Sequence, residues 1–228
     1  MTKILIPIET SIGERRVSAT PETVKKLKNL GCDVYIEKSA GELSGFKDFS
    51  YEESGGIIFT EQDFNLWKEV DIIFCIHCPD YEKLNKLKEG CLIIGLLNPF
   101  GNKDLAKLLS DLKLSAIALE LLPRISRAQS SDVLSSQANI AGYKSVLLAA
   151  SELDRYFPML MTAAGTVQPA KVVVLGGGVA GLQAVATAKR LGALVFVSDI
   201  RPAVKEQVES LGAKFINLPE IDEKPSES

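Results

Sequence analysis

The stretch that decides the fold is KVVVLGGGVAGLQAVATAKRLGALVFVSD, residues 171–199. Its valine-rich start, Lys171–Leu175, predicts a strand that runs directly into the glycine pattern G-x-G-x-x-G. The pattern from about Val179 to Leu191 then predicts a helix, and a second strand follows. A glycine turn between a strand and a helix is typical of a dinucleotide-binding site, whose phosphates bind the N–H groups at the positive end of the helix.

The three glycines of this pattern have separate expected roles. Gly176 permits the tight turn, Gly178 lets a pyrophosphate approach the backbone, and Gly181 lets helix and strand pack closely. A packing turn with no ligand is the alternative. If a nucleotide binds, we expect it to contact Gly176, Gly177, Gly178, Val179, Gly181, Asp199, Ile200 and Arg201.

The acidic residue at the end of the second strand bears on the choice of nucleotide. Leu194–Ser198 is followed by Asp199, whose carboxylate can accept hydrogen bonds from the adenosine ribose and repels a 2′-phosphate. This favours NAD(H) over NADP(H). Arg201 could tolerate a phosphate, so the sequence leaves the selectivity open.

Working outward, short apolar runs alternate with helical patterns along the chain, which indicates βαβ units and parallel sheets. Thr20 and Pro21 predict the start of a helix that ends at Gly31. The earlier strands are expected at Lys3–Ile8, Val34–Glu37, Gly56–Phe59, Val70–Ile76, Cys91–Leu96 and Ser115–Leu119, and a last one at Lys214–Ile216.

The expected class is therefore α/β, with two doubly wound parallel-sheet, Rossmann-like domains joined by a long helix. We expect a flavodoxin- or Rossmann-like domain over 1–132 and a linking helix over 133–160, with its clear helical pattern from Val133 to Tyr156. Residues 161–228 should form the first half of a NAD(H)-binding domain, which makes the second domain incomplete. The final stretch, 219–228, has no periodicity and should be a frayed tail or a cut end.

Composition excludes several classes of function. A net charge of −3 without a basic cluster argues against a nucleic-acid partner, and MTKILIPIET has no signal-sequence pattern. The chain is expected to be cytoplasmic, without direct membrane insertion. Cys75, His77, Cys78 and Cys91 invite a zinc interpretation, but a fourth ligand at finger spacing is missing, so buried, reduced cysteines are favoured.

A polar loop, PRISRAQSSDVLSSQANIAGY over residues 123–143, holds more polar groups than a connector needs. Arg124, Gln129, Asp132 and Ser135 are its candidate functional side chains. The alternative is that Asp132 caps the following helix and pairs with an arginine at the surface.

This loop, together with FPMLMTAAGTVQPAKVVVLGGGVAGLQAVATAKRLGA and KEQVESLGAKF, closely resembles the NAD(H)-binding first domain of the proton-translocating nicotinamide nucleotide transhydrogenases, alpha subunit. The opening IPIETSIGERRVSATPETVKKLKNLGCDVYIEKSAG also fits alanine dehydrogenases, which share the fold. The resemblance covers nearly the whole chain.

The resemblance implies that the polar loop lies over the nicotinamide ring, with Arg124, Gln129, Asp132 and Ser135 as the catalytic set. Asp132 would fix Arg124 in a charge-assisted pair, and Gln129 and Ser135 would bond the carboxamide or ribose. A hydride passes directly between two nicotinamides, so no acid or base is needed and the protein supplies position.

The same resemblance implies partners. NADP(H) would be held by a partner domain, and a membrane-spanning domain would translocate protons, which places the chain peripherally at the inner membrane. A homodimer is also implied.

An alanine dehydrogenase is the main alternative. Those enzymes are similar to this chain at Arg16, whose counterpart binds the substrate carboxylate, but they also use a lysine and a histidine after two strands. Here those positions fall at Ile76-His77-Cys78-Pro79 and Leu97-Asn98-Pro99. Neither group is present, although His77 could partly substitute, and oxidation of an amino acid needs an acid/base group.

The chain stops earlier than the family pattern. We expect it to be a fragment or one piece of a split subunit, inactive alone and weak at best in binding the adenosine end. An inactive nucleotide-binding remnant is the third possibility.

Overall fold

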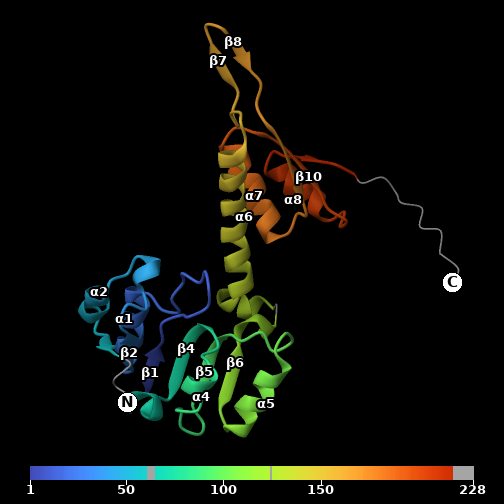
Figure 1. Ribbon diagram of the computed structural model, residues 1–228. Helices are drawn as coiled ribbons and strands as arrows, with labels where there is room; N and C mark the ends of the chain where they lie inside the picture. The colour runs from blue at the N-terminus through green and yellow to red at the C-terminus, as the bar shows by residue number, and fades with distance from the viewer. Residues whose placement is uncertain (61–64, 124, 218–228) are drawn as a thin grey trace, which may run out of the picture. The chain divides into compact units, whose positions relative to one another are not determined.

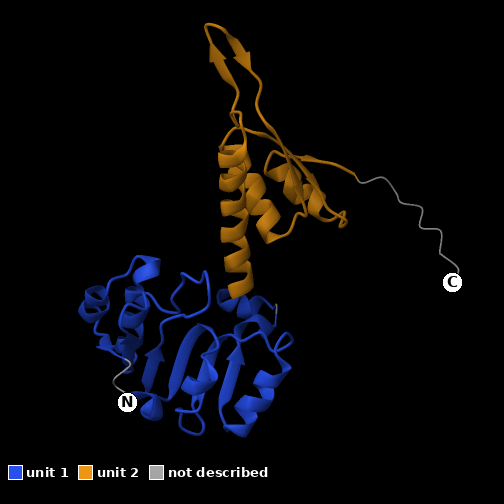
Figure 2. Cartoon of the chain, in the orientation of Figure 1, with its two compact units in different colours: residues 1–132 blue, residues 133–228 orange. Residues whose placement is uncertain are grey.

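The computed structural model describes residues 1–60, 65–123 and 125–217. Arg124 and the expected tail at 219–228 lie outside the described residues. The chain divides into two compact units, residues 1–132 and 133–228 (Figure 2). No helix in the described ranges is both long enough and apolar enough to cross a membrane.

Unit 1 is built on a parallel sheet, which has six strands in its described residues, in the order β3-β2-β1-β4-β5-β6 (Figure 1). The strands are β1 Lys3–Ile6, β2 Asp33–Glu37, β3 Ile57–Phe59, β4 Ile72–His77, β5 Leu92–Leu96 and β6 Ser115–Ala118. This is the doubly wound order, with the direction of winding reversing between β1 and β4. The predicted α/β class is confirmed, and all six expected strands are present.

Some strand ends differ from the prediction. β1 ends at Ile6 and not at Ile8, because Pro7 has no N–H to donate to a neighbouring strand. β4 begins at Ile72, because Val70 instead ends the preceding helix.

The first helix begins and ends as predicted. α1 spans Pro21–Asn29, the Thr20 hydroxyl accepts a hydrogen bond from the Thr23 N–H at 3.3 Å, and Gly31 follows with φ +83°. The other helices of unit 1 are η1 Glu42–Ser44, α2 Asp48–Glu53, α3 Leu66–Glu69, α4 Tyr81–Leu84, α5 Lys103–Asp111, η2 Leu119–Leu121 and η3 Ser126–Ser131.

Both faces of this sheet are buried, so alternate residues of one strand enter different cores. Leu5 packs in a cluster with Ile73 and Ile93, whereas Ile6 packs in a second cluster with Val24. Burial on both faces leaves the carboxyl edge of the sheet as the place where polar groups gather.

Unit 2 contains a second parallel sheet, with strand order β11-β10-β9 in its described residues. Its elements are α6 Val133–Glu152, the antiparallel pair β7 Leu160–Thr162 and β8 Gly165–Val167, β9 Lys171–Leu175, α7 Val179–Arg190, β10 Leu194–Ser198, α8 Val204–Ser210 and β11 Lys214–Phe215. The order corresponds to the first half of a dinucleotide-binding sheet, as the sequence predicts.

Two features of unit 2 differ from the expectation. The long helix α6 ends at Glu152, short of Tyr156, and the chain is already irregular before Pro158, which disfavours a helical residue at Phe157. The hairpin β7–β8 was not expected, and Figure 1 shows it standing away from the sheet of the same unit.

Helix α6 packs directly on α7. A Cβ built on Gly142 would lie 2.1 Å from the Ala180 carbonyl oxygen, so only glycine permits this approach. Val146, one turn further along α6, is buried in the core that contains Val185 of α7. This contact fixes the first turn of α7, which contains Gly181, the last glycine of the pattern.

Candidate functional site

The glycine turn of unit 2 has the geometry expected of a close strand-to-helix connection. Gly176 has φ +94°, a left-handed conformation that suits glycine, and its N–H donates to the Ser198 carbonyl at 2.8 Å. A Cβ on Gly181 would lie 1.8 Å from the Gly176 carbonyl oxygen. The expected turning role of Gly176 and packing role of Gly181 are confirmed.

The N-terminus of α7 suits an anion. Helix α7 begins at Val179, and the N-cap residue before it, Gly178, has no side chain that could bond the N–H groups of the first turn. The first-turn N–H groups of a helix have no partner inside the helix. A Cβ built on Gly178 would meet nothing within 4 Å, so there is open space in front of this backbone. These residues therefore fit the phosphates of a dinucleotide.

Asp199, at the end of β10, faces this turn and is held from several sides. Its Oδ2 accepts from the Gly177 N–H at 2.7 Å and from Nη2 of Arg201 at 3.0 Å. Its Oδ1 accepts from the N–H of Arg201 at 2.8 Å and from Nε of Arg201 at 3.0 Å. The Arg201 guanidinium, with the two N–H groups, holds the pKa of this carboxyl well below its usual range. The next side chain, Ile200, is 86% exposed and offers an apolar surface beside the carboxylate.

The polar loop, residues 123–143, spans the boundary between the two units in the sequence. Gln129 is exposed in η3, and its carbonyl accepts from the Asp132 N–H at 3.2 Å. Ser135 is half-buried in the first turn of α6. Arg124 lies outside the described residues. The nicotinamide role of these four residues stays a prediction.

Unit 1 has a pocket at its own switch point, at the carboxyl ends of β1 and β4. It is lined by residues 7–11 and 77–80 and by Lys83. Glu9 closes one side, since its carboxylate accepts from the Ile76 N–H at 2.6 Å and the His77 N–H at 3.1 Å. The buried Glu37 carboxylate accepts from the Ile8 N–H at 2.9 Å. These carboxylates bind backbone N–H groups at the two strand ends.

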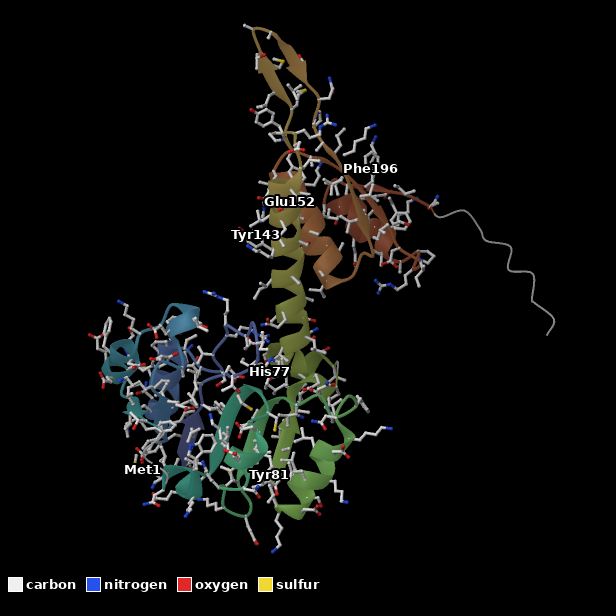
Figure 3. All side chains as sticks on the ribbon, viewed as in Figure 1. Met1, His77, Tyr81, Tyr143, Glu152 and Phe196 are labelled. Carbon is white, nitrogen blue, oxygen red and sulfur yellow. The ribbon has the colours of Figure 1, made fainter. Side chains whose placement is uncertain are left out.

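Beside this pocket, Glu14 contacts both Arg16, which is shared with the alanine dehydrogenases, and His77. Its carboxylate accepts from Nε and Nη2 of Arg16, at 2.8 and 2.6 Å, and its Oε2 lies 2.9 Å from Nε2 of His77, labelled in Figure 3. The Arg16 guanidinium is the main cause that lowers the pKa of Glu14 to about 2. The sequence interpretation missed Glu14, and the available signal was its place two residues before Arg16.

Burial favours the protonated thiol form of three cysteines of unit 1, Cys75, Cys78 and Cys91. Burial raises the pKa of Cys78 and of Cys91 to about 11, and raises that of Cys75 further. No group of three or more metal-binding side chains is found among the residues that the structure describes.

Comparison with known proteins gives matches along both units. The family model of the alanine dehydrogenase/PNT N-terminal domain matches residues 5–141, and that of the C-terminal domain matches residues 145–227. A NAD(P) transhydrogenase subunit alpha polypeptide of Rhodospirillum rubrum is 46% identical, over 99% of this chain and 60% of that protein. Alanine dehydrogenase 2 of Staphylococcus aureus is 32% identical, over 92% of this chain and 56% of that protein.

Among solved structures, the transhydrogenase from Sinorhizobium meliloti superposes with a TM-score of 0.90 at 48% identity. The match covers 96% of this chain and 62% of that one. The chain thus spans about 60% of the length of the R. rubrum relative.

Proposed function

This chain belongs to the alanine dehydrogenase/PNT family, and from that premise we propose that it is the NAD(H)-binding component of a proton-translocating transhydrogenase. The observation that carries the proposal is the glycine turn of unit 2, with open space at Gly178 and the Asp199 carboxylate facing the turn. The higher identity to a transhydrogenase subunit than to an alanine dehydrogenase, 46% against 32%, supports the choice within the family.

The chain's own residues bind and position the nucleotide. The N–H groups at the start of α7 receive the phosphates, Asp199 binds the adenosine ribose, and the apolar side chain of Ile200 packs near the adenine. NADH supplies the hydride, which a nicotinamide can pass directly to a second nicotinamide. Arg124, Gln129, Asp132 and Ser135 orient the ring, because hydride transfer needs the reacting carbons held about 3–3.5 Å apart.

The partners follow from the same proposal. NADP(H) binds a separate domain or subunit, and a membrane-spanning domain translocates the proton, so the chain works on the cytoplasmic side at the inner membrane. A homodimer is part of the proposal, and the 79% exposed side chain of Met161 on the hairpin offers apolar surface for it. The chain is proposed to be inactive alone.

The amino-acid dehydrogenase activity is disfavoured by the site beside β4. Arg16 is held by Glu14, and an asparagine, Asn98, stands near the end of β5 where those enzymes use a histidine. Oxidation of an amino acid would need an acid/base group in that place, and an asparagine side chain does not titrate.

The test begins with a calorimetric titration of the purified chain with NADH, and with NADPH as the control. Selective NADH binding supports the proposal, and no binding argues for a remnant. Hydride transfer is then assayed with an NADP(H)-binding component, with and without a polypeptide that corresponds to the remaining length of the relatives. Activity that needs all three supports a component role. Oxidation of alanine with NAD would instead select the dehydrogenase.

A further inference from the structure

Helix α6 carries the end of the polar loop into unit 2 and packs along α7 (Figure 1). Three of its residues, Ser135, Asn139 and Gly142, are spaced by four and then three positions, so they lie on one face of the helix. This face meets α7, because a Cβ on Gly142 would lie 2.1 Å from the Ala180 carbonyl oxygen. The packing of α6 on α7 therefore decides where Ser135, a proposed nicotinamide ligand, lies relative to the glycine turn.

A pair of amide side chains ties the two helices together one turn nearer to the polar loop. Nδ2 of Asn139 donates to Oε1 of Gln183 at 3.2 Å. Gln183 is itself fixed, since its Nε2 donates to the Thr187 hydroxyl at 3.3 Å and that hydroxyl donates to the Gln183 carbonyl at 2.8 Å. Thr187 is buried. The tie therefore runs from the polar-loop end of α6 to the core of unit 2.

A small tilt of α6 about its contact at Gly142 would displace the polar-loop end of the helix. Ser135 lies seven residues from Gly142, which is about 10 Å at a rise of about 1.5 Å per residue. A tilt of about 5° would then move Ser135 by about 1 Å, and a misplacement of that size can slow a reaction by about a hundredfold. Val146 holds α6 in the core on the far side of Gly142. Asn139 holds it on the side of the polar loop.

On the basis of the proposed function, we propose that Asn139 and Gln183 are a positioning pair, which holds Ser135 where it binds the nicotinamide end of NADH. Both residues act through the placement of α6 and not on the reacting atoms. Their hydrogen bond lies at the surface, so its loss should change the stability of unit 2 little and should be detected in the binding of the nicotinamide end. The two residues act as a unit, so a second substitution adds little to the first.

The experiment compares two ligands that differ only in the nicotinamide. NADH and ADP-ribose, which has the adenosine and both phosphates but no nicotinamide, are titrated by calorimetry into the native chain, Asn139→Leu, Gln183→Leu and the double variant. Leucine is a good helix former that has no hydrogen-bonding side-chain group. Ser151→Leu, on α6 but beyond Gly142 from the polar loop, is the matched control. Urea unfolding followed by far-UV circular dichroism checks that each variant is folded.

The expected result is a loss of the preference for NADH over ADP-ribose. Each single variant should lower the ratio of the two affinities by about two- to tenfold, the change expected when one neutral hydrogen bond is lost, while ADP-ribose binds as it does to the native chain. The double variant should lose no more than the more affected single variant. Ser151→Leu should keep the native ratio.

An unchanged ratio in Asn139→Leu and Gln183→Leu overturns the proposal. Equal losses for the two ligands also overturn it, because the pair would then only support the fold of α7, and so do losses that add in the double variant. Failure of the proposed function looks different, since it appears in the native chain. A native chain that binds NADH no better than ADP-ribose, or binds neither, rejects the nicotinamide role and this inference with it.

Discussion

Two glycines of the glycine pattern, Gly178 and Gly181, should have different roles, one in nucleotide binding and one in folding. Replacing each of them by alanine tests this. At Gly178 the new methyl meets no atom within 4 Å, and φ −76° suits alanine, so unit 2 should keep its stability within about 1 kcal/mol. The methyl enters the space proposed for the pyrophosphate, so NADH affinity should fall by about tenfold or more, a loss of only about 1.4 kcal/mol.

At Gly181, by contrast, we expect the substitution by alanine to lower the stability of unit 2. The methyl would lie 1.8 Å from the Gly176 carbonyl oxygen, which is backbone and cannot turn away. Overpacking of this kind costs about 1–3 kcal/mol, against a helix-propensity gain of at most about 1 kcal/mol. With the full propensity gain subtracted, unit 2 of Gly181→Ala should therefore be less stable by up to about 2 kcal/mol.

The assay uses the single tryptophan of the chain as an internal control. Trp67 is buried in the core of unit 1, so its fluorescence follows unit 1 during urea unfolding, while far-UV circular dichroism follows both units. The fluorescence transition should be unchanged in both variants. If Gly178→Ala destabilised unit 2 as much as Gly181→Ala does, or bound NADH like the native chain, the assignment of the two glycines would be wrong.

Three further outcomes are expected. Gly142→Ala should lower the stability of unit 2 by about 1–3 kcal/mol, since its methyl would meet the Ala180 carbonyl, and urea unfolding followed by circular dichroism measures this loss. The Glu14 pKa is lowered from 4.5 to about 2, so its stabilisation of unit 1, at most about 3 kcal/mol, should be present above pH 4.5 and lost as the pH falls to 2. Glu14→Gln should flatten that region of the pH profile of the fluorescence transition, and an unchanged profile would rule out this carboxylate as its cause. Tyr51→Phe should cost unit 1 about 0.5–1.5 kcal/mol in the same assay, because the buried hydroxyl donates to the Ala19 carbonyl at 2.9 Å.

Much of the fold was predictable because the signals are local. The run Lys171–Leu175 and the glycines after it specify strand, turn and helix with little help from the rest of the chain, and the structure has these elements at the predicted place. Thr20 and Pro21 likewise specify the start of α1.

What the sequence did not reveal depends on pairing between distant residues. The close approach of Gly142 to Ala180 cannot be read from the pattern of α6, in which that glycine looks like an ordinary weak point of a helix. The bond between Glu14 and His77 joins the loop after β1 to the end of β4, so only the sheet order brings the two together. The locking of Arg201 onto Asp199 was open because the sequence shows only that both are present.

The strand order of unit 1 has a consequence for how the chain folds as it is synthesised. β1 is made first but lies in the interior of the sheet, where Ile4 pairs with Val34 of β2 on one side and with Ile72 of β4 on the other. One edge of β1 must therefore remain open until β4 has been made, and such non-local parallel pairing is slow and exposes the chain to aggregation. In unit 2, β9 needs only the next helix and strand before it pairs with β10. The second unit should accordingly fold soon after it is made. Unit 1 should fold well only if the open edge of β1 does not pair with another unfolded chain before β4 has been made.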